Sequence, residues 1–265
     1  MRQFRNIVAS RRLIWEPSML ETSPTPNAIA LRAELLRIQD LQAWYGDSYI
    51  LHGLSIDVKE GEVVTLLGRN GAGKTTLLKS IMGIVSKRRG SIQFRGAQII
   101  SLSSDRIARL GIAICPEERG IFASLNVREN LLLPPKLGRG GGLSLAKIFE
   151  LFPNLHERLD SGGGKLSGGE QQMLAIARIL RTGAKFLMLD EPTEGLAPVI
   201  VEQIKRTINA LKLEGFTILL VEQNFRFAAQ VSDRFYVIEN GGVIDGFVQA
   251  ELSANMNKLH QYLGV

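Results

Sequence analysis

The chain has 265 residues, of which 45% are hydrophobic and 22% charged, and its formal net charge is +6. This length and composition are typical of a globular protein built around one large α/β domain, and they exclude an intrinsically disordered chain. No run approaches the roughly 18 apolar residues that a membrane-spanning helix needs. The single cysteine, Cys115, has no partner for a disulfide within the chain, which fits a reducing cytosol. The three histidines, His52, His156 and His260, lack the spacing of metal ligands, so we expect no metal site built from side chains alone.

Residues 1–33 differ in composition from the rest of the chain. They contain EPSMLETSPTPN, a stretch rich in proline, serine and threonine, which is typical of a linker or tail. Four arginines stand in the first dozen residues, namely Arg2, Arg5, Arg11 and Arg12. No long apolar run follows them, so the segment does not resemble a signal peptide. We expect a disordered basic tail, or a start upstream of the true one at Met19. The alternative is a basic arm that touches anionic lipid headgroups.

From about Leu35 onward the pattern becomes regular, and strands alternate with helices. Apolar runs typical of strands occupy 54–58, 61–68, 91–96, 111–115, 186–190, 217–222 and 234–241. Helical patterns occupy 74–84, 145–152, 170–181 and 199–215. This order predicts an α/β fold with a mostly parallel sheet that is covered on both faces. We therefore divide the chain into a tail, 1–33, and one domain, 34–265, with a helical insertion at about 118–181.

A glycine-rich stretch, GRNGAGKTT, lies between the strand pattern at 61–68 and the helical pattern at 74–84. It matches G-x-x-x-x-G-K-T, in which the backbone wraps phosphate groups, the lysine reaches the β- and γ-phosphate oxygens, and the threonine hydroxyl faces Mg²⁺. The alternative, a chance glycine-rich turn, is disfavoured by the strand and helix on either side. We predict a nucleoside triphosphate site formed by Gly68, Arg69, Asn70, Gly71, Ala72, Gly73, Lys74, Thr75 and Thr76.

Two acidic residues end the apolar strand pattern FLMLDEP at 186–192. Because ligands of such sheets bind at the carboxyl ends of the strands, we expect these acids beside the phosphate loop. Asp190 can hold Mg²⁺ through water, and Glu191 can orient and deprotonate an attacking water. The alternative is an ordinary strand exit with two solvated acids, and the phosphate loop favours the catalytic interpretation.

A second motif suited to phosphate, LSGGEQQ at 166–172, stands at the start of the helical pattern at 170–181. It aims backbone N–H groups and the positive end of a helix at an anion, but it contains no lysine. One domain would thus contain two phosphate-binding loops, only one of which has a lysine. Upstream, Tyr45 in AWYGDSYIL offers a face on which adenine can stack, although a lone aromatic is as often part of the core or of a surface patch.

These motifs, in this order, closely resemble those of ABC-type ATPases from about Leu35 to Val265. The resemblance implies a P-loop NTPase fold with a RecA-like core whose sheet is mostly parallel, an antiparallel β part and an inserted helical subdomain. In that family two nucleotide-binding domains face each other head to tail, and each signature loop closes on the ATP held by the other domain. Ser167, Gly168 and Gly169 would therefore bind in trans to the partner's ATP.

The same resemblance assigns the remaining site residues. Tyr45 matches the adenine-stacking position, and EGLAP at 194–198 matches the loop that communicates across the dimer. Glu117 stands where a glutamine usually meets magnesium and the membrane subunit, and Gln223 stands where a histidine usually contacts the γ-phosphate. The implied metal ligands are Thr75, Glu117 and Asp190, and the implied catalytic residues are Glu191 and Gln223. For Gln223 the alternative is a cap on the helix that NFRFAAQVS predicts.

Finer details resemble one branch of the family, the second ATPase subunit of branched-chain amino acid importers. They lie in CPEERGIFASLNVRENLLL, DEPTEGLAPVIVEQI, LLVEQN and the ending YLGV. The resemblance implies hydrolysis of ATP with Mg²⁺, in a pair with a second ATPase subunit that is a different chain or, in isolation, a second copy. That pair would sit on two transmembrane permease subunits at the cytoplasmic face of the bacterial inner membrane. A periplasmic or extracellular binding protein would take part indirectly, and no nucleic-acid partner is expected.

Two alternatives remain at this point. A soluble ABC ATPase that acts on DNA or ribosomes usually has two nucleotide domains per chain or long coiled-coil inserts, whereas this chain predicts one domain and no heptad run. Urea, short amides or other amino acids are alternative cargoes, because an ATPase subunit does not touch the cargo and no residue here encodes it.

Overall fold

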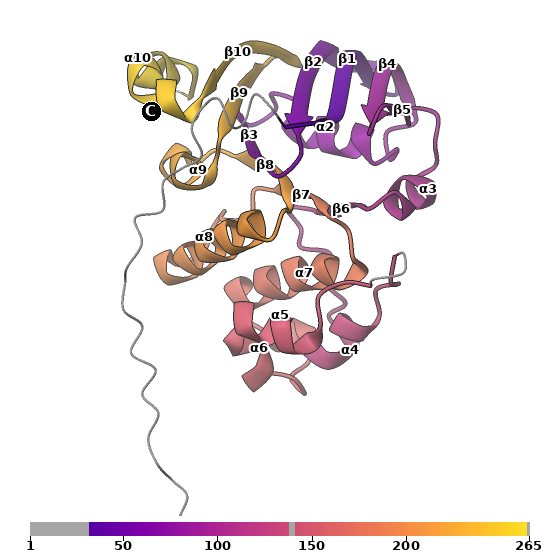
Figure 1. The fold of residues 1–265 in the computed structure, drawn as a ribbon, viewed down its shortest axis with the longest axis vertical. Helices are drawn as coiled ribbons and strands as arrows, with labels where there is room; N and C mark the ends of the chain where they lie inside the picture. The colour runs from indigo at the N-terminus through magenta and orange to yellow at the C-terminus, as the bar shows by residue number, and fades with distance from the viewer. Residues whose placement is uncertain (1–31, 138–140, 264–265) are drawn as a thin grey trace, which may run out of the picture.

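The computed structural model describes residues 32–137 and 141–263. Two sheets lie in the upper part of the view in Figure 1, and a group of helices lies below them. The four N-terminal arginines, Met19 and the last two residues of the YLGV stretch lie outside the described residues. The tail interpretation of 1–33 therefore stays a prediction.

The first sheet is antiparallel, and its strand order is β2-β1-β4-β5. Its strands are β1 (Glu34–Tyr45), β2 (Ser48–Lys59), β4 (Lys87–Phe94) and β5 (Ala97–Gln98). Along β1, Leu36 and Ile38 are buried whereas Arg37 between them is exposed, which is the alternation expected of a sheet with one solvated face. A short turn joins β1 to β2, and Tyr45, the last residue of β1, thus lies at the end of this hairpin.

The second sheet has the strand order β10-β9-β3-β8-β7-β6, and all neighbours are parallel except β9 and β10. Its strands are β3 (Val63–Leu67), β6 (Ile112–Cys115), β7 (Phe186–Asp190), β8 (Thr217–Glu222), β9 (Arg234–Glu239) and β10 (Gly242–Val248). The predicted α/β fold with a mostly parallel sheet is confirmed. Three strands, β1, β5 and β10, are not among the strand patterns identified from the sequence.

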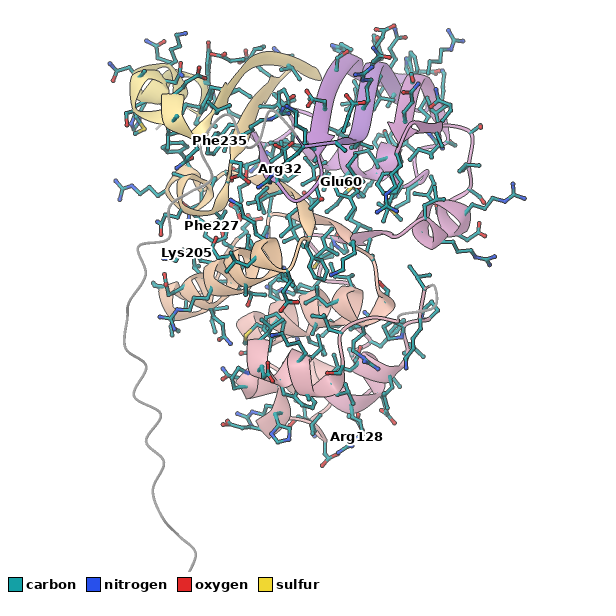
Figure 2. The ribbon with its side chains drawn as sticks, in the orientation of Figure 1. Arg32, Glu60, Arg128, Lys205, Phe227 and Phe235 are labelled. Atoms are coloured by element: carbon teal, nitrogen blue, oxygen red, sulfur yellow. The ribbon has the colours of Figure 1, made fainter. Side chains whose placement is uncertain are left out.

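Both faces of the second sheet are covered, and residues along its central strands alternate between two cores. On β7, Phe186 and Met188 enter the core shared with the antiparallel sheet, whereas Leu187 and Leu189 enter the core shared with the helices. Strands buried on both faces are continuously apolar, which explains runs such as FLMLD. A third, smaller cluster joins β9 to the last helix and includes the buried Phe235, which is labelled in Figure 2.

The helices occupy the connections between the strands. They are α2 (Lys74–Ile81), α3 (Ser104–Arg109), α4 (Val127–Leu132), α5 (Leu145–Leu151), α6 (Pro153–Glu157), α7 (Gly168–Thr182), α8 (Pro198–Leu213), α9 (Phe225–Val231) and α10 (Leu252–Leu263), with short 3-10 turns at Gly163–Lys165 and Gln249–Glu251. Helices α4 to α7 all fall between the neighbouring strands β6 and β7, and they form the lower part of the molecule in Figure 1. Among the described helices, none has the length and apolar character required to span a membrane.

Candidate active site at the phosphate loop

The phosphate loop joins β3 to α2 at the carboxyl end of the parallel strands. The five residues of β3 are all buried, so the loop starts from a fixed strand. A Cβ on Gly68 would overlap the carbonyl oxygen of Ile238, and Gly73 ends the loop at a φ of 105°; only glycine fits both positions without strain. The N–H groups of Gly73, Lys74 and Thr75 form no hydrogen bond within the described part of the chain. The first turn of α2 therefore offers free donors and a positive helix end to an anion.

The Lys74 side chain is buried and folds back over the loop. Its Nζ donates to the carbonyl oxygens of Gly68 at 2.7 Å and Arg69 at 3.1 Å. The same nitrogen lies 3.4 Å from Oε1 of Glu191. The cation is thus held at the loop by acceptors that a phosphate oxygen could replace.

Asp190 ends β7 and lies beside Thr75, the second residue of α2. The Thr75 hydroxyl donates to Oδ1 of Asp190 at 3.2 Å, and Asp190 is only 1% exposed. Burial raises the pKa of Asp190 to about 6; the Thr75 hydrogen bond opposes this shift, and the charges of Glu191 and Glu117 add to it. A hydroxyl and a carboxylate held together in this way fit a hard divalent cation.

Glu191 follows directly and has a backbone φ of 45°, in the left-handed region. Its N–H donates to the carbonyl of Val221 on β8 at 3.0 Å, which holds the residue at the sheet edge in this conformation. Its two carboxylate oxygens face different partners, Lys74 on one side and Gln223 on the other. The side chain is therefore fixed between the phosphate loop and the end of β8.

Gln223 follows β8 and reaches two site residues with one amide. Its Nε2 donates to Oδ1 of Asn70 at 2.6 Å and to Oε2 of Glu191 at 2.6 Å. The helix-capping alternative for Gln223 is wrong. The N-cap of α9 is Asn224, whose side chain accepts from the N–H of Phe227 at 3.1 Å. Gln223 instead links Asn70 of the phosphate loop to Glu191, the acidic residue after β7.

Two predicted site residues stand apart from this cluster. Glu117 lies in the exposed loop after β6, and its negative charge contributes to the raised pKa of Asp190. Tyr45 is 48% exposed at the end of β1, so the interpretation of this ring as part of the core is wrong. Its exposed face leaves both the adenine-stacking and the surface-patch interpretations.

The signature loop precedes α7 and is closed by its own hydrogen bonds. The Ser167 hydroxyl accepts from the Glu170 N–H at 3.3 Å, and the Glu170 carboxylate accepts from the Ser167 N–H at 2.8 Å, which is a capping box. Gly168 is partly exposed, whereas Gly169 is buried against α8, where a Cβ would come within 2.7 Å of Ile200 Cγ1. Packing alone therefore explains the second glycine. No hydrogen bond or ion pair in the described chain joins this loop to Lys74 or Glu191.

Two residues near the site, Glu222 and Arg119, were not identified from the sequence. Glu222 ends β8, is 2% exposed, and accepts hydrogen bonds from Thr193; burial raises its pKa to about 7, against the lowering effect of those bonds. The signal was present in LLVEQN, an acid at the end of a buried strand. Arg119, after β6, donates to Gln171 of α7 at 2.9 Å. Nothing in the local sequence indicates that contact.

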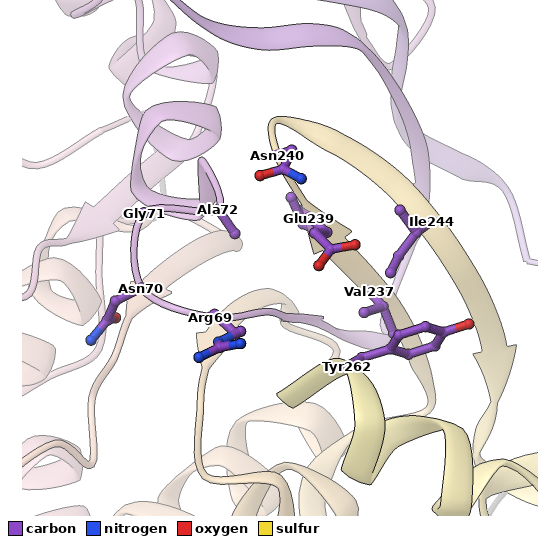
Figure 3. Close-up of a pocket in the computed structure, with 10 residues that line it drawn as sticks. Arg69, Asn70, Gly71, Ala72, Val237, Glu239, Asn240, Ile244 and Tyr262 are labelled. Carbon is purple, nitrogen blue, oxygen red and sulfur yellow. The ribbon is translucent and has the colours of Figure 1, made fainter. Parts of the chain in front are cut away.

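A separate cavity of about 360 Å³ lies on the outer side of the phosphate loop. It is lined by Arg69, Asn70, Gly71 and Ala72 of the loop, by Val237, Ile238, Glu239, Asn240 and Ile244 of β9, β10 and their turn, and by Tyr262 of α10. Figure 3 shows the Tyr262 ring next to Ile244 and Val237. Neither Lys74 nor Glu191 lines this cavity, and it shares Asn70 with the cluster described above.

Comparison with models of protein families identifies the family of this chain. The model described as ABC transporter matches residues 51–194, which is more than half of the chain and includes both loops and both acids. The chain belongs to the ABC transporter family. The resemblance inferred from the sequence is confirmed, and with it the fold class of this ABC protein.

Known ABC proteins match the chain over nearly their whole length. The high-affinity branched-chain amino acid transport ATP-binding protein BraG of Pseudomonas aeruginosa is 43% identical over 239 residues, 87% of this chain and 100% of that protein. The probable branched-chain amino acid transport ATP-binding protein LivF of Archaeoglobus fulgidus is 38% identical, over 79% of this chain and 90% of that protein. A nucleotide-free ATP-binding cassette from an ABC transporter has a TM-score of 0.76 at 26% identity, with 88% of this chain and 99% of that one covered.

Proposed function

We propose that this chain is the ATP-binding and ATP-hydrolysing subunit of an importer for branched-chain amino acids. The observation that carries the hydrolytic part is the convergence of Lys74, Glu191 and Gln223 at the phosphate loop. The cargo is supported by the similarity to BraG and LivF, both of which are named for branched-chain amino acid transport.

ATP binds with its phosphates along the free N–H groups at the start of α2. Lys74 then exchanges its contact with Glu191 for the β- and γ-phosphate oxygens, because a phosphate carries more negative charge than a single carboxylate. This exchange frees one Glu191 oxygen for water. Tyr45 supplies a stacking face for adenine, for which its exposed ring is suited.

Thr75 and Asp190 provide the oxygens that Mg²⁺ prefers, and they already lie within hydrogen-bond distance of each other. Among the described residues, no group of three or more His, Cys, Asp or Glu side chains could hold a metal. Phosphate oxygens and water would supply the other ligands, as they usually do for Mg²⁺. Glu117 lies in an exposed loop and is not bonded to this pair, and its negative charge contributes to the raised pKa of Asp190. When bound, the ion neutralises charge on the β- and γ-phosphate oxygens.

Hydrolysis uses Glu191 to orient a water and accept its proton. Gln223 holds this carboxylate through its amide and can also donate to the γ-phosphate. Glutamine carries no titratable charge near neutral pH, so this half-site gains contact without a strong electrostatic contribution, and we expect it to be slower than one that bears histidine.

Each complete site requires a second subunit. No hydrogen bond or ion pair among the described residues joins the loop of Ser167 and Gly168 to Lys74 of the same chain. In the head-to-tail arrangement these two residues face the partner's ATP, and Gly169 packs behind them against Ile200. The partner is a second ABC ATPase subunit, and the pair drives two permease subunits from the cytoplasmic face of the bacterial membrane. A binding protein outside the membrane delivers the amino acid.

The test is ATP hydrolysis by the transporter assembled with its permeases and binding protein. Glu191→Gln should retain ATP binding and lower hydrolysis by roughly 10²–10⁴-fold, the usual contribution of a general base. Glu202→Gln, an exposed acid on α8, is the matched control and should change neither. Unchanged turnover in Glu191→Gln would refute the assigned role. For the cargo, the binding protein is titrated with leucine, isoleucine, valine and urea, and preference for urea would replace the proposed cargo.

A further inference from the structure

Glu222 is a carboxylate buried at the end of the central strand β8, directly before Gln223. Its Oε1 accepts from the Thr193 hydroxyl at 2.8 Å and from the Thr193 N–H at 3.3 Å. Its Oε2 accepts from the Asn224 N–H at 3.3 Å. One oxygen thus holds the loop after β7, and the other holds the loop after β8.

These two loops carry the two side chains that meet at the phosphate loop. Thr193 lies two residues after Glu191, and Asn224 is the residue after Gln223. The Glu191 and Gln223 side chains are themselves joined at 2.6 Å. The Glu222 carboxylate therefore closes a second connection between the same two loops, deeper in the fold than the first.

Strands β7 and β8 are already joined without this acid, because they are paired along their length and that pairing continues to the Glu191 N–H. The groups that donate to Glu222, on Thr193 and Asn224, are uncharged, and Glu222 takes part in no ion pair among the described residues. Burying a carboxylate without a cation costs free energy that an apolar side chain of similar size would avoid. The position of Glu222 is better explained by the two loops that its carboxylate joins.

We propose that Glu222 is a positioning residue for ATP hydrolysis, whose two oxygens fix the loop that carries Glu191 against the loop that carries Gln223. The inference rests on the proposed function, because positioning has meaning only if Glu191 acts on water and Gln223 acts beside it. The phosphate loop has its own contacts, so binding of ATP does not depend on this clamp.

Thr193→Val is the most direct test, because it removes the hydroxyl donor while preserving the shape of the side chain. In the assembled transporter, kcat for ATP should fall about tenfold, the effect expected from losing one buried hydrogen bond, with KM within about twofold. Thr193→Ser restores the hydroxyl and should restore kcat. Thr207→Val is the matched control, since Thr207 is also buried but donates to Gln203 within α8. Unchanged kcat in Thr193→Val would overturn the inference.

A kinetic double-mutant cycle tests whether the clamp acts through Gln223. In a Gln223→Ala background, Thr193→Val should lower kcat by less than about twofold, because the side chain to be positioned is gone. A full tenfold loss in that background would overturn the inference, since the two changes would then be independent. Thermal unfolding of each purified variant identifies any loss of fold.

If Thr193→Val does not fold, Glu222→Gln carries the same prediction. It keeps one carbonyl oxygen and replaces the other by an amide donor, so it can hold one loop and not both. Retention of wild-type kcat in this variant would overturn the inference. Glu191→Gln separates this outcome from failure of the proposed function. If Glu191→Gln abolishes hydrolysis while the clamp variants are normal, only the clamp is wrong; if Glu191→Gln is normal, the proposed function is wrong.

Discussion

The phosphate loop and the signature loop both lead into the N-terminus of a helix, yet the two helices begin in different ways. Helix α2 begins after Gly73, with no side-chain cap and with free N–H groups in its first turn. Helix α7 begins after Ser167, whose side chain and that of Glu170 satisfy each other's backbone N–H groups. The first loop also has Lys74, whereas the LSGGEQQ motif of the second contains no lysine.

This difference shows which loop can bind an anion without a partner subunit. The first turn of α2 exposes donors that need an acceptor, so the loop is organised for phosphate before any phosphate arrives. The first turn of α7 is already satisfied in part, so its stability does not depend on a ligand. A loop of this second kind suits a contact that forms and breaks as two subunits close and separate.

The largest effect should come from the lysine that only one loop has. Lys74→Ala should abolish ATP binding by the purified chain, because the β- and γ-phosphate oxygens lose the side-chain cation of the loop. Lys165→Ala removes an exposed lysine beside the signature loop and is the matched control. Nucleotide titrations of both variants test the pair. Equal losses of affinity would break the distinction between the two loops.

A negative charge on the signature loop should act on the partner's nucleotide and not on the chain's own. A Cβ at Gly168 would lie 3.3 Å from Arg119 Nη2, at the movable end of that side chain, so Gly168→Asp should fold. Turnover by the assembled transporter should fall by about 10², as when one donor to a developing oxyanion is lost. ATP affinity of the purified chain should be unchanged, and Gly168→Ala should be milder. Loss of affinity in the isolated chain would contradict binding in trans.

In the absence of nucleotide and metal, ionisation of the acids beside the two loops should change the stability of the fold in opposite directions. Burial raises the pKa of Asp190 to about 6 from 3.8, so its ionisation lowers stability as pH rises through that range. Asp190→Asn should therefore raise the free energy of unfolding by about 2 kcal/mol at pH 8 and have little effect near pH 4.

At the signature loop, partial burial of Glu170 would raise its pKa, but the hydrogen bonds with Ser167 lower it. Its contribution to stability is present above pH 4.5 and is lost as pH falls. Glu170→Gln should consequently lower stability at pH 7, by less than Asp190→Asn raises it at pH 8. Denaturant unfolding at each pH measures the free energy of unfolding of both variants. Changes of the same sign would show that the two acids do not differ in this way.

The positions of both loops could be predicted from the sequence because each depends on short-range order. A buried strand, four fixed residues and a helix define the phosphate loop, and a capping box with two glycines defines the signature loop. Gly169 shows the limit of that reasoning, since its packing against Ile200 comes from α8 and not from the motif.

The contacts made by Gln223 could not be predicted. Its partners Asn70 and Glu191 are 153 and 32 residues away, and they meet because β8 lies between β3 and β7 in the sheet. Strand order is a property of the whole chain that no local pattern encodes. The helix cap proposed for Gln223 is likewise formed by its neighbour Asn224, whose side chain accepts from the N–H of Phe227.

The backbone of Glu191 has a consequence for how this position can change over evolutionary time. A φ of 45° disfavours every L-residue with a Cβ by about 1 kcal/mol relative to glycine, so the carboxylate is kept against a local preference. A lineage that no longer needs hydrolysis at this half-site could relieve this strain by changing to glycine, with loss of the contacts to Lys74 and Gln223. Catalysis and backbone preference favour different residues at this one position.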